Sequence, residues 1–260
     1  MNSGDDRVRE VFGARAAFYV TSPTHTDTSV LDRVVGLARP EPAARALDVG
    51  TAAGHTALAL APHVGDVVGV DITPEMLVEA GKLRVERGIA NVRFVMANAT
   101  SLPFGDLSFD IVTCRRAAHH FSDVARALVE MRRVLKPGGR LVIDDRSVPE
   151  DDFVDSTMNH LDRLHDASHV RQYRVSEWSG MLRDAGLAVE SIEQYTRHRP
   201  LTSLTADVEP EAVAQIGAII AALSEEEGAA MSVVEKAGQI YTNHWYVMIA
   251  AVRGLTPARS

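Results

Sequence analysis

The segment at residues 46–55, Ala-Leu-Asp-Val-Gly-Thr-Ala-Ala-Gly-His, constrains the fold more than any other part of the chain. A short apolar run leads into a glycine turn that opens a helix, and the next apolar run ends at Asp71. In a parallel βαβ unit this pattern places backbone amides beside a ligand and a carboxylate beside a ribose diol. It predicts an α/β fold with a nucleoside-binding crevice.

The glycine spacing separates the candidate nucleosides. A dinucleotide turn beginning at Gly50 would have glycines where this chain has Ala52 and His55, so a dinucleotide-dependent oxidoreductase is disfavoured. No Gly-Lys-Ser/Thr follows, which argues against a triphosphate-binding loop. Asp48 lies before the turn, where a carboxylate would repel a pyrophosphate and suit a cation. S-adenosylmethionine, with its ammonium and sulfonium groups, has that charge.

Further motifs follow the glycine turn in a fixed order, within about residues 45–146. They are Val-Asp-Ile-Thr-Pro-Glu-Met at 70–76, Phe-Val-Met-Ala-Asn-Ala at 94–99, Leu-Pro-Phe at 102–104, Ser-Phe-Asp at 108–110 and Arg-Val-Leu-Lys-Pro-Gly-Gly-Arg at 133–140. The ordered set resembles the class I S-adenosylmethionine-dependent methyltransferases, and Ala52 replaces the middle glycine of their first motif. His119-His120-Phe121 is similar to their small-molecule branch of type 11, which includes ubiquinone and menaquinone enzymes.

Composition favours a small-molecule enzyme. At 260 residues the chain is long enough for one α/β domain with additions, and its formal net charge of −8 argues against binding a phosphate backbone. The single cysteine, Cys114, excludes an intramolecular disulfide, and no apolar run approaches the ~20 residues of a membrane span. The first residues lack the basic and apolar regions of a signal peptide. We expect a cytoplasmic monomer or homodimer without nucleic-acid or membrane partners.

Alternating apolar runs and helical spacing predict a parallel sheet covered on both faces. Strands are expected near 45–49, 66–71, 92–96, 109–115, 140–145, 187–196 and 240–252, and helices near 5–18, 25–38, 54–62, 74–88, 122–136, 153–166, 176–184 and 209–223. The resemblance implies a Rossmann-like doubly wound sheet of seven strands in the order 3-2-1-4-5-7-6, with strand seven antiparallel.

Additions to this core are expected at two places. Residues 1–40 are interpreted as a helical lid, in which the loop at 19–25 folds over the nucleoside. Residues 41–260 form the methyltransferase domain, with an insertion at about 148–180 that the resemblance identifies as a small helical substrate cap.

The cofactor is expected beyond the carboxyl ends of the strands, where the strand order reverses between strands one and four. Gly50 and Gly54 would let the turn approach the ligand, and Asp71 would accept from both ribose hydroxyls. The alternative for Asp71 is a solvent-facing cap of helix 74–88. Asp48 either braces the turn or attracts the ammonium. The full set of expected contacts is Tyr19, Asp48, Gly50, Thr51, Ala52, Gly54, Asp71, Ile72, Met76, Asn98, Ala99 and Arg115.

The adenine ring is expected between the second and third strands. Ile72 and Met76 would lie against one side of it, although both could instead be simple core residues. Asn98 and Ala99 stand where the family usually has an aspartate that accepts from the adenine amino group. Asn98 could accept that bond through its amide oxygen.

His119 and His120 follow the fourth strand at the switch point, where the reactive methyl should lie. An imidazole there can remove a proton from a hydroxyl, phenol or activated carbon during methyl transfer. The alternative is that one histidine packs beneath the cofactor while the other caps helix 122–136. Asp145 is expected to orient a histidine or the substrate, and Asp144 should point to the opposite face of the strand.

A second polar group lies beyond the fifth strand. Arg171 and His169, with His160 and with His25 of the N-terminal loop, are predicted to bind the substrate, an acidic or carbonyl-bearing molecule. Simple surface solvation is the alternative. No metal site is expected, since neither His-Glu-x-x-His nor clustered Cys/His spacing occurs.

Two reactions remain open at this stage. The first is methyl transfer to an oxygen, nitrogen or carbon of a small metabolite by direct displacement. The second is a non-methylating reaction such as a cyclisation, for which the same crevice would hold S-adenosylmethionine. The methyl acceptor is not identified by any motif.

Overall fold

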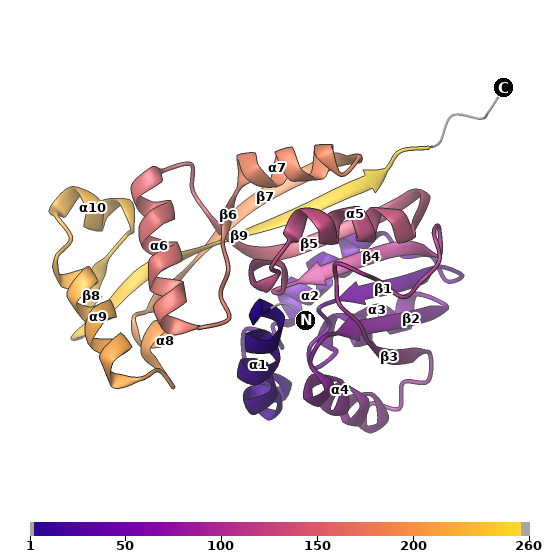
Figure 1. The fold of residues 1–260 in the computed structure, drawn as a ribbon, viewed down its shortest axis with the longest axis horizontal. Coiled ribbons are helices and arrows are strands. Elements are labelled where there is room, and N and C mark those ends of the chain that lie inside the picture. The colour runs from indigo at the N-terminus through magenta and orange to yellow at the C-terminus, as the bar shows by residue number, and fades with distance from the viewer. Residues whose placement is uncertain (1–2, 256–260) are drawn as a thin grey trace.

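The computed structural model describes residues 3–255. Their strands form one mixed sheet with the order β3-β2-β1-β4-β5-β9-β7 (Figure 1). The strands are β1 Arg45–Val49, β2 Asp66–Asp71, β3 Val92–Met96, β4 Phe109–Arg115, β5 Leu135–Val148, β7 Leu187–Pro200 and β9 Gln239–Arg253. β9 is antiparallel to both β5 and β7, while the strands from β3 to β5 are parallel. With β7 and β9 as the sixth and seventh strands, the predicted order and the fold class are confirmed. Short strands β6 (Tyr173–Arg174) and β8 (Val234–Lys236) pair with β5 and β9.

Helices cover both faces of the sheet (Figure 1). On one face lie α2 (Thr28–Ala38), α3 (His55–Leu60) with the 3₁₀ turn at Ala61–His63, and α4 (Pro74–Glu86). On the other lie α5 (Val124–Val134) and α7 (Val175–Asp184). This two-sided cover explains why the central strands read as continuous apolar runs rather than as alternating patterns.

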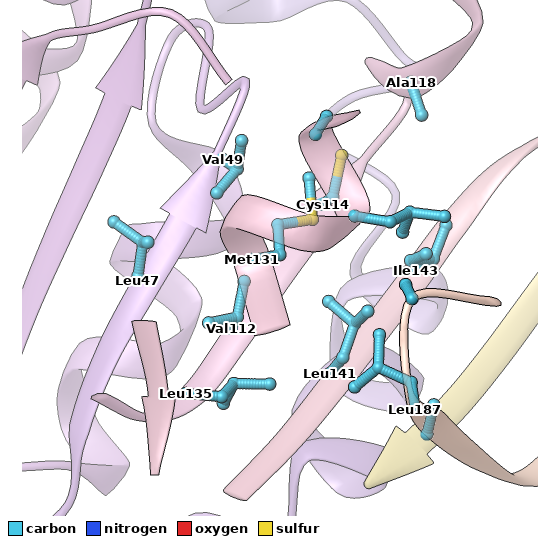
Figure 2. Packing of buried hydrophobic residues seen from close by; sticks show 14 of the residues in the cluster. Leu47, Val49, Val112, Cys114, Ala118, Met131, Leu135, Leu141, Ile143 and Leu187 are labelled. Atoms are coloured by element: carbon cyan, nitrogen blue, oxygen red, sulfur yellow. The ribbon is translucent and has the colours of Figure 1, made fainter. Parts of the chain in front are cut away.

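The larger apolar core lies between the sheet and α5 and α7. Figure 2 shows Leu141 and Ile143 of β5 packed near Leu187 of β7, with Met131 of α5 above β4. Leu141 is 1% exposed. α5 presents its apolar residues at helical spacing toward these strands, which is why the segment forms an amphipathic helix.

A helical cap lies at one end of the molecule, around the first part of β9 and its partner β8 (Figure 1). It consists of α6 (Asp152–His165), α8 (Thr202–Thr205), α9 (Pro210–Ala221) and α10 (Glu225–Ala230), packed on a separate apolar cluster. The sequence-based boundary of about 148–180 therefore covers only part of this cap, and α7 packs with the body instead. α8, α10 and β8 were not predicted, although Ser224 and Glu227 form a capping box at the start of α10.

The N-terminal helix is longer than predicted. α1 spans Ser3–Thr21 and packs against α4, so Tyr19 lies in the helix and not in a loop. The connection to α2 is correspondingly short and ends at Asp27, whose carboxylate caps α2 by accepting from the amides of Ser29 and Val30. None of the helices within residues 3–255 is long and apolar enough to cross a membrane.

β5 begins five residues earlier than predicted. Leu135 pairs with Phe109 of β4, and a register shift follows before the regular pairing of Ile111 with Arg140. The Pro-Gly-Gly sequence at 137–139 therefore forms an irregularity inside the strand, not a break before it. Gly139 is required there, because a Cβ atom would lie 2.8 Å from the carbonyl oxygen of Lys136.

Replacing Leu141 with alanine should lower the free energy of unfolding by about 2–5 kcal/mol, because it removes a buried side chain and leaves a cavity. Urea unfolding followed by circular dichroism measures the change. Val85→Ala, at a position 69% exposed on α4, is the matched control and should change stability by less than about 0.5 kcal/mol. Equal effects of the two substitutions would contradict this assignment of the core.

Candidate active site

The glycine turn after β1 is held by a buried carboxylate. Asp48, 1% exposed, accepts hydrogen bonds from the hydroxyls of Thr51 and Thr113, each at 2.7 Å. Thr51 belongs to the turn and Thr113 to β4, so Asp48 joins both sides of the switch point. Asp48 does not line either cavity described below. Of the two interpretations of Asp48, the structure therefore favours the one in which it braces the turn.

Positive φ angles define the turn. Gly50, Ala52 and Gly54 have φ angles of 67°, 45° and 84°. A Cβ atom at Gly50 would lie 2.4 Å from the Cβ of Ala117, and one at Gly54 would lie 2.8 Å from the ring of Phe94. These glycines are thus required by backbone conformation and by packing against the protein itself.

Asp71 is the last residue of β2, and both of its carboxylate oxygens accept hydrogen bonds from backbone amides. One oxygen accepts from the amide of Ala52 and the other from the amide of Thr73, both at 2.9 Å. Burial raises the pKa of Asp71, and these amides oppose the rise. Each oxygen has a second lone pair, so the carboxylate can also accept from two hydroxyls of a ligand.

A narrow cavity of about 90 Å³ lies above the carboxyl ends of β1, β2 and β4. Ten of the predicted cofactor contacts line it: Tyr19, Gly50, Thr51, Ala52, Asp71, Ile72, Met76, Asn98, Ala99 and Arg115. Gly54 does not line the cavity but precedes the first turn of α3. α1 forms one side of this space through Asp5, Val8 and Phe12. We call it the nucleoside cavity, because it lies at the switch point of the sheet.

Asn98 is engaged differently from the prediction. Its amide oxygen accepts from both the amide and the hydroxyl of Thr100, at 2.9 and 2.8 Å, so both lone pairs are used. Its amide nitrogen donates to Asp5 of α1 at 2.8 Å. The acceptor on this wall of the cavity is therefore the carboxylate of Asp5, which sequence analysis did not identify because it lies 93 positions away in the chain.

Arg115 supplies a donor to the same cavity. It is 7% exposed, and it donates to the hydroxyl of Thr56 at 2.9 Å and to the carbonyl oxygen of His25 at 2.8 Å. Its third donor group, Nη1, is buried and has no hydrogen-bond partner among the described residues. A buried guanidinium nitrogen without a partner is costly, so an anionic group of a ligand fits at this position.

A second cavity of about 610 Å³ lies between the first one and the cap. Four residues line both cavities: Tyr19, His25, Arg116 and His120. The remaining wall of the second cavity includes His119, His169 and, on the side next to the cap, Arg146, Asp162, His165, Arg199, Ser203, His244 and Tyr246. The predicted residues His25, His119, His120 and His169 are thus brought together here.

His119 and Asp145 form a hydrogen-bonded pair. Nδ1 of His119 bonds to Oδ1 of the fully buried Asp145, and the backbone amide of His119 donates to Oδ2 at 3.2 Å. Burial would raise the pKa of Asp145, but the charge and hydrogen bond of His119 outweigh it and lower that pKa. The ionised carboxylate keeps the His119 proton on Nδ1, leaving Nε2 as an acceptor on the wall of the second cavity.

The other histidines are held as neutral rings. Nδ1 of His120 lies 3.2 Å from the carbonyl oxygen of Ser168, and burial together with His119 lowers the pKa of His120 to about 4. Nε2 of His169 lies 3.1 Å from Oδ1 of Asn159, and burial lowers the pKa of His169 to about 3. Within residues 3–255, neither ring has a carboxylate that accepts a hydrogen bond from it.

Asp144 points away from Asp145, as strand alternation predicts. It accepts from Nε of Arg116 at 3.0 Å and from the hydroxyl of Tyr195 at 2.6 Å. The Arg116 guanidinium also lies 3.8 Å from the ring centroid of Tyr246. Arg116 was missed as a site residue, although it stands directly after the predicted Arg115 at the end of β4.

Two predicted substrate contacts lie outside both cavities. Arg171 is paired with Asp155 at 3.0 Å and with Glu177 at 2.9 Å, so its charge is neutralised within the cap side of the molecule. His160 is exposed on the surface of α6. The prediction that these two side chains bind the substrate is corrected accordingly, since the charge of Arg171 is used to join α6 to the start of α7.

Comparison with known proteins identifies clear relatives. The family described as Methyltransferase domain matches residues 47–143. The uncharacterized methyltransferase YcgJ of Bacillus subtilis is 45% identical over 184 residues, which cover 71% of this chain and 73% of YcgJ. The crystal structure of YcgJ superimposes with a TM-score of 0.82 at 37% identity, covering 87% of this chain and 98% of that one.

A quinone enzyme is also similar over a shorter region. The demethylmenaquinone methyltransferase of Thermus thermophilus is 43% identical over 113 residues, which cover 43% of this chain and 51% of that protein. The similarity therefore concerns about half of the length of each protein.

The buried Asp48 should make stability depend on pH. Burial raises the pKa of Asp48 to about 6, although the hydroxyls of Thr51 and Thr113 oppose the rise. An unfolded aspartate has a pKa near 3.9, so between about pH 4 and 6 the folded state retains a proton that the unfolded state loses. The free energy of unfolding should therefore fall as pH rises through this range, by up to about 3 kcal/mol from this group.

Urea unfolding at intervals from pH 4 to 7 tests this expectation. Asp48→Asn cannot titrate, so its stability should fall less than that of the parent protein as pH rises. Asp32→Asn, at an exposed position of α2, is the control and should follow the parent curve. Parallel curves for Asp48→Asn and the parent protein would show that Asp48 is not protonated in the fold.

Proposed function

Because the chain belongs to the class I S-adenosylmethionine-dependent methyltransferases, we propose that it methylates an oxygen, nitrogen or carbon of a small metabolite held in the second cavity. The observation that carries the proposal is that two cavities meet at one shared wall, formed by Tyr19, His25, Arg116 and His120. A donor in the first cavity and an acceptor in the second would face each other across this wall. Alignment of the reacting atoms supplies a large part of the rate of such a displacement.

The residues of the nucleoside cavity fit S-adenosylmethionine. Asp71 has free lone pairs for the ribose hydroxyls, and the unpaired Nη1 of Arg115 suits the methionine carboxylate. Asp5 can accept from the adenine amino group. When bound, the cofactor supplies an electrophilic methyl group on sulfur. The protein's own groups orient it by charge and hydrogen bonding.

His119 is the general base in this proposal. Its Nε2 accepts the proton of the substrate hydroxyl, amine or activated carbon as the new bond to the methyl carbon forms and the carbon–sulfur bond breaks. Asp145 holds the ring in the required tautomer and stabilises the imidazolium that results. The choice between the two adjacent histidines falls on His119, because the low pKa of His120, about 4, makes it a weak base.

α1 acts as the lid. Its Arg9 donates to the carbonyl oxygen of Ile72 at 3.2 Å, and its Phe12 packs edge-on against His120 with ring centroids 4.8 Å apart. The space beneath it, about 90 Å³, is smaller than the ~300–1,000 Å³ of most ligand pockets. Movement of α1 and its side chains would therefore accompany entry and release of the nucleoside.

The reaction is tested by incubating the protein with S-adenosylmethionine and a panel of metabolites that includes demethylmenaquinone and related quinols, the acceptors suggested by the name of the T. thermophilus relative. Formation of S-adenosylhomocysteine together with a product heavier by one methylene unit supports the proposal. Full conversion of an acceptor without S-adenosylhomocysteine would favour a non-methylating reaction instead.

Asp71→Asn should weaken binding of S-adenosylhomocysteine at least ten-fold, because an amide cannot accept from both ribose hydroxyls and both backbone amides. Isothermal titration calorimetry measures the dissociation constant. Asp66→Asn, at the other end of the same strand and outside both cavities, should bind as the parent does. An unchanged dissociation constant for Asp71→Asn would remove the ribose role from Asp71.

His119→Ala should lower kcat by about 10²–10⁴-fold with the acceptor that the panel identifies, because the general base is lost. Binding of S-adenosylhomocysteine should change little, since His119 does not line the nucleoside cavity. Steady-state kinetics and calorimetry give the two values. His160→Ala, an exposed histidine, is the control. A full-rate His119→Ala enzyme would show that the base is another group or that none is needed.

A further inference from the structure

The wall of the second cavity next to the cap carries three donors without a protein partner among the described residues, from three separate elements. Arg199 is near the end of β7, Ser203 is in α8 and His244 is in β9. None of them lines the nucleoside cavity or the wall shared by the two cavities. We call these three residues the cap donors. Their place separates them from the position where the methyl group would be transferred.

Arg199 differs from the other arginines of this cavity. Arg116 is paired with Asp144 at 3.0 Å and Arg146 with Asp162 at 2.6 Å, while Arg15 donates to the carbonyl oxygen of Asp207 at 3.0 Å. Arg199 has no carboxylate within 4 Å and no hydrogen-bond acceptor among residues 3–255. Its half-buried guanidinium therefore contributes an unneutralised positive charge to the cavity.

His244 adds a buried N–H donor. It is 1% exposed, and its Nδ1 lies 2.5 Å from Nη1 of Arg146. A guanidinium can only donate, so Nδ1 is the acceptor and the proton of the neutral ring lies on Nε2. Burial and the charge of Arg146 lower the pKa of His244, which keeps the ring neutral. Nε2 has no partner in the described part of the chain.

Ser203 is the third cap donor without a partner. Its Oγ is buried and makes no hydrogen bond to the described residues. A buried donor left unpaired is unfavourable, and Ser203 and His244 contribute two of them beside the unneutralised Arg199. A ligand that accepts from all three is the simplest explanation.

The carboxylates of the second cavity do not accept hydrogen bonds from the cap donors. Asp162 accepts from Arg146 and from Gln172, and Asp166 accepts from the amide and hydroxyl of Ser168 on the side of His120. Asp207 is exposed. The positive potential near the cap donors is also visible at Tyr246, because Arg146, Arg116 and Arg199 together overcome burial and lower the pKa of its phenol to about 7.

We infer that the cap donors bind an oxyanion of the methyl acceptor, a carboxylate or a phosphate group, through the guanidinium of Arg199, Nε2–H of His244 and the hydroxyl of Ser203. The inference rests on the proposed function and specifies its substrate class: an anionic metabolite whose charged group lies at the cap while its reacting atom faces His119. The planar guanidinium of Arg199 can donate to two oxygens of one anion, and the neutral donors His244 and Ser203 supply directional hydrogen bonds.

Calorimetry on the full chain saturated with S-adenosylhomocysteine tests the inference with three probes of similar size: benzoate, phenyl phosphate and the neutral benzamide. At least one of the two anions should bind ten-fold or more tightly than benzamide, and the stronger of the two identifies the group as a carboxylate or a phosphate. Equal binding of all three probes, or tighter binding of benzamide, would overturn the inference.

Arg199→Gln should reduce the preference for the anion at least ten-fold. Arg163→Gln removes the same charge from an exposed position of α6 in the same cap and should leave the preference unchanged. Circular dichroism checks folding, and Ser203→Ala is a second variant that removes one hydroxyl and should weaken anion binding several-fold. An undiminished preference in folded Arg199→Gln, or equal losses in it and Arg163→Gln, would also overturn the inference.

The same samples keep this test separate from that of the proposed function. Titration of S-adenosylhomocysteine alone reports on the nucleoside cavity, which contains none of the cap donors. If that titration fails while the anion preference persists without nucleoside, the proposed function is contradicted and the anion site is retained. If nucleoside binds and the preference is missing, only the anion site is lost.

Discussion

The buried carboxylate of Asp48 is the interaction on which the organisation of the site depends. It accepts from Thr51 in the glycine turn and from Thr113 in β4, which lie on opposite sides of the point where the strand order reverses. These two hydrogen bonds hold the turn against the neighbouring strand. The turn then positions the amide of Ala52 to donate to Asp71. The same reversal sends α3 and α5 to opposite faces of the sheet and leaves the carboxyl ends of the strands accessible to a ligand.

Charge is distributed unevenly between the two cavities. Buried arginines reach both, but most are already neutralised by carboxylates on adjacent strands or on α6, as Arg116 is by Asp144 and Arg146 by Asp162. The groups left without partners are the informative ones, namely Nη1 of Arg115 in the first cavity and the cap donors in the second. Paired arginines shape the walls, whereas unpaired donors indicate where a ligand would be held.

Most of the body of the fold could be predicted from the chain alone. The central strands β1, β2 and β4 follow the apolar runs, because a strand buried on both faces must be apolar along its length. The errors occur where local signals conflict with tertiary contacts. Pro-Gly-Gly at 137–139 indicates a break, yet pairing of Leu135 with Phe109 continues the strand through it. Tyr19 was placed in a loop, but packing of α1 on α4 extends the helix past it.

What the sequence by itself determined is the methyltransferase family and the residues gathered at the switch point: the glycine turn, Asp71 and the histidine pair. These residues lie within one contiguous region, where spacing along the chain translates directly into position on parallel strands. The wall of the second cavity next to the cap was decided only by the tertiary structure. Arg199, Ser203 and His244 come from β7, α8 and β9, and no periodicity relates them. Their meeting depends on how the helix and the long hairpin fold back over the sheet, so Arg171 appeared to be a substrate residue until its partners Asp155 and Glu177 were seen.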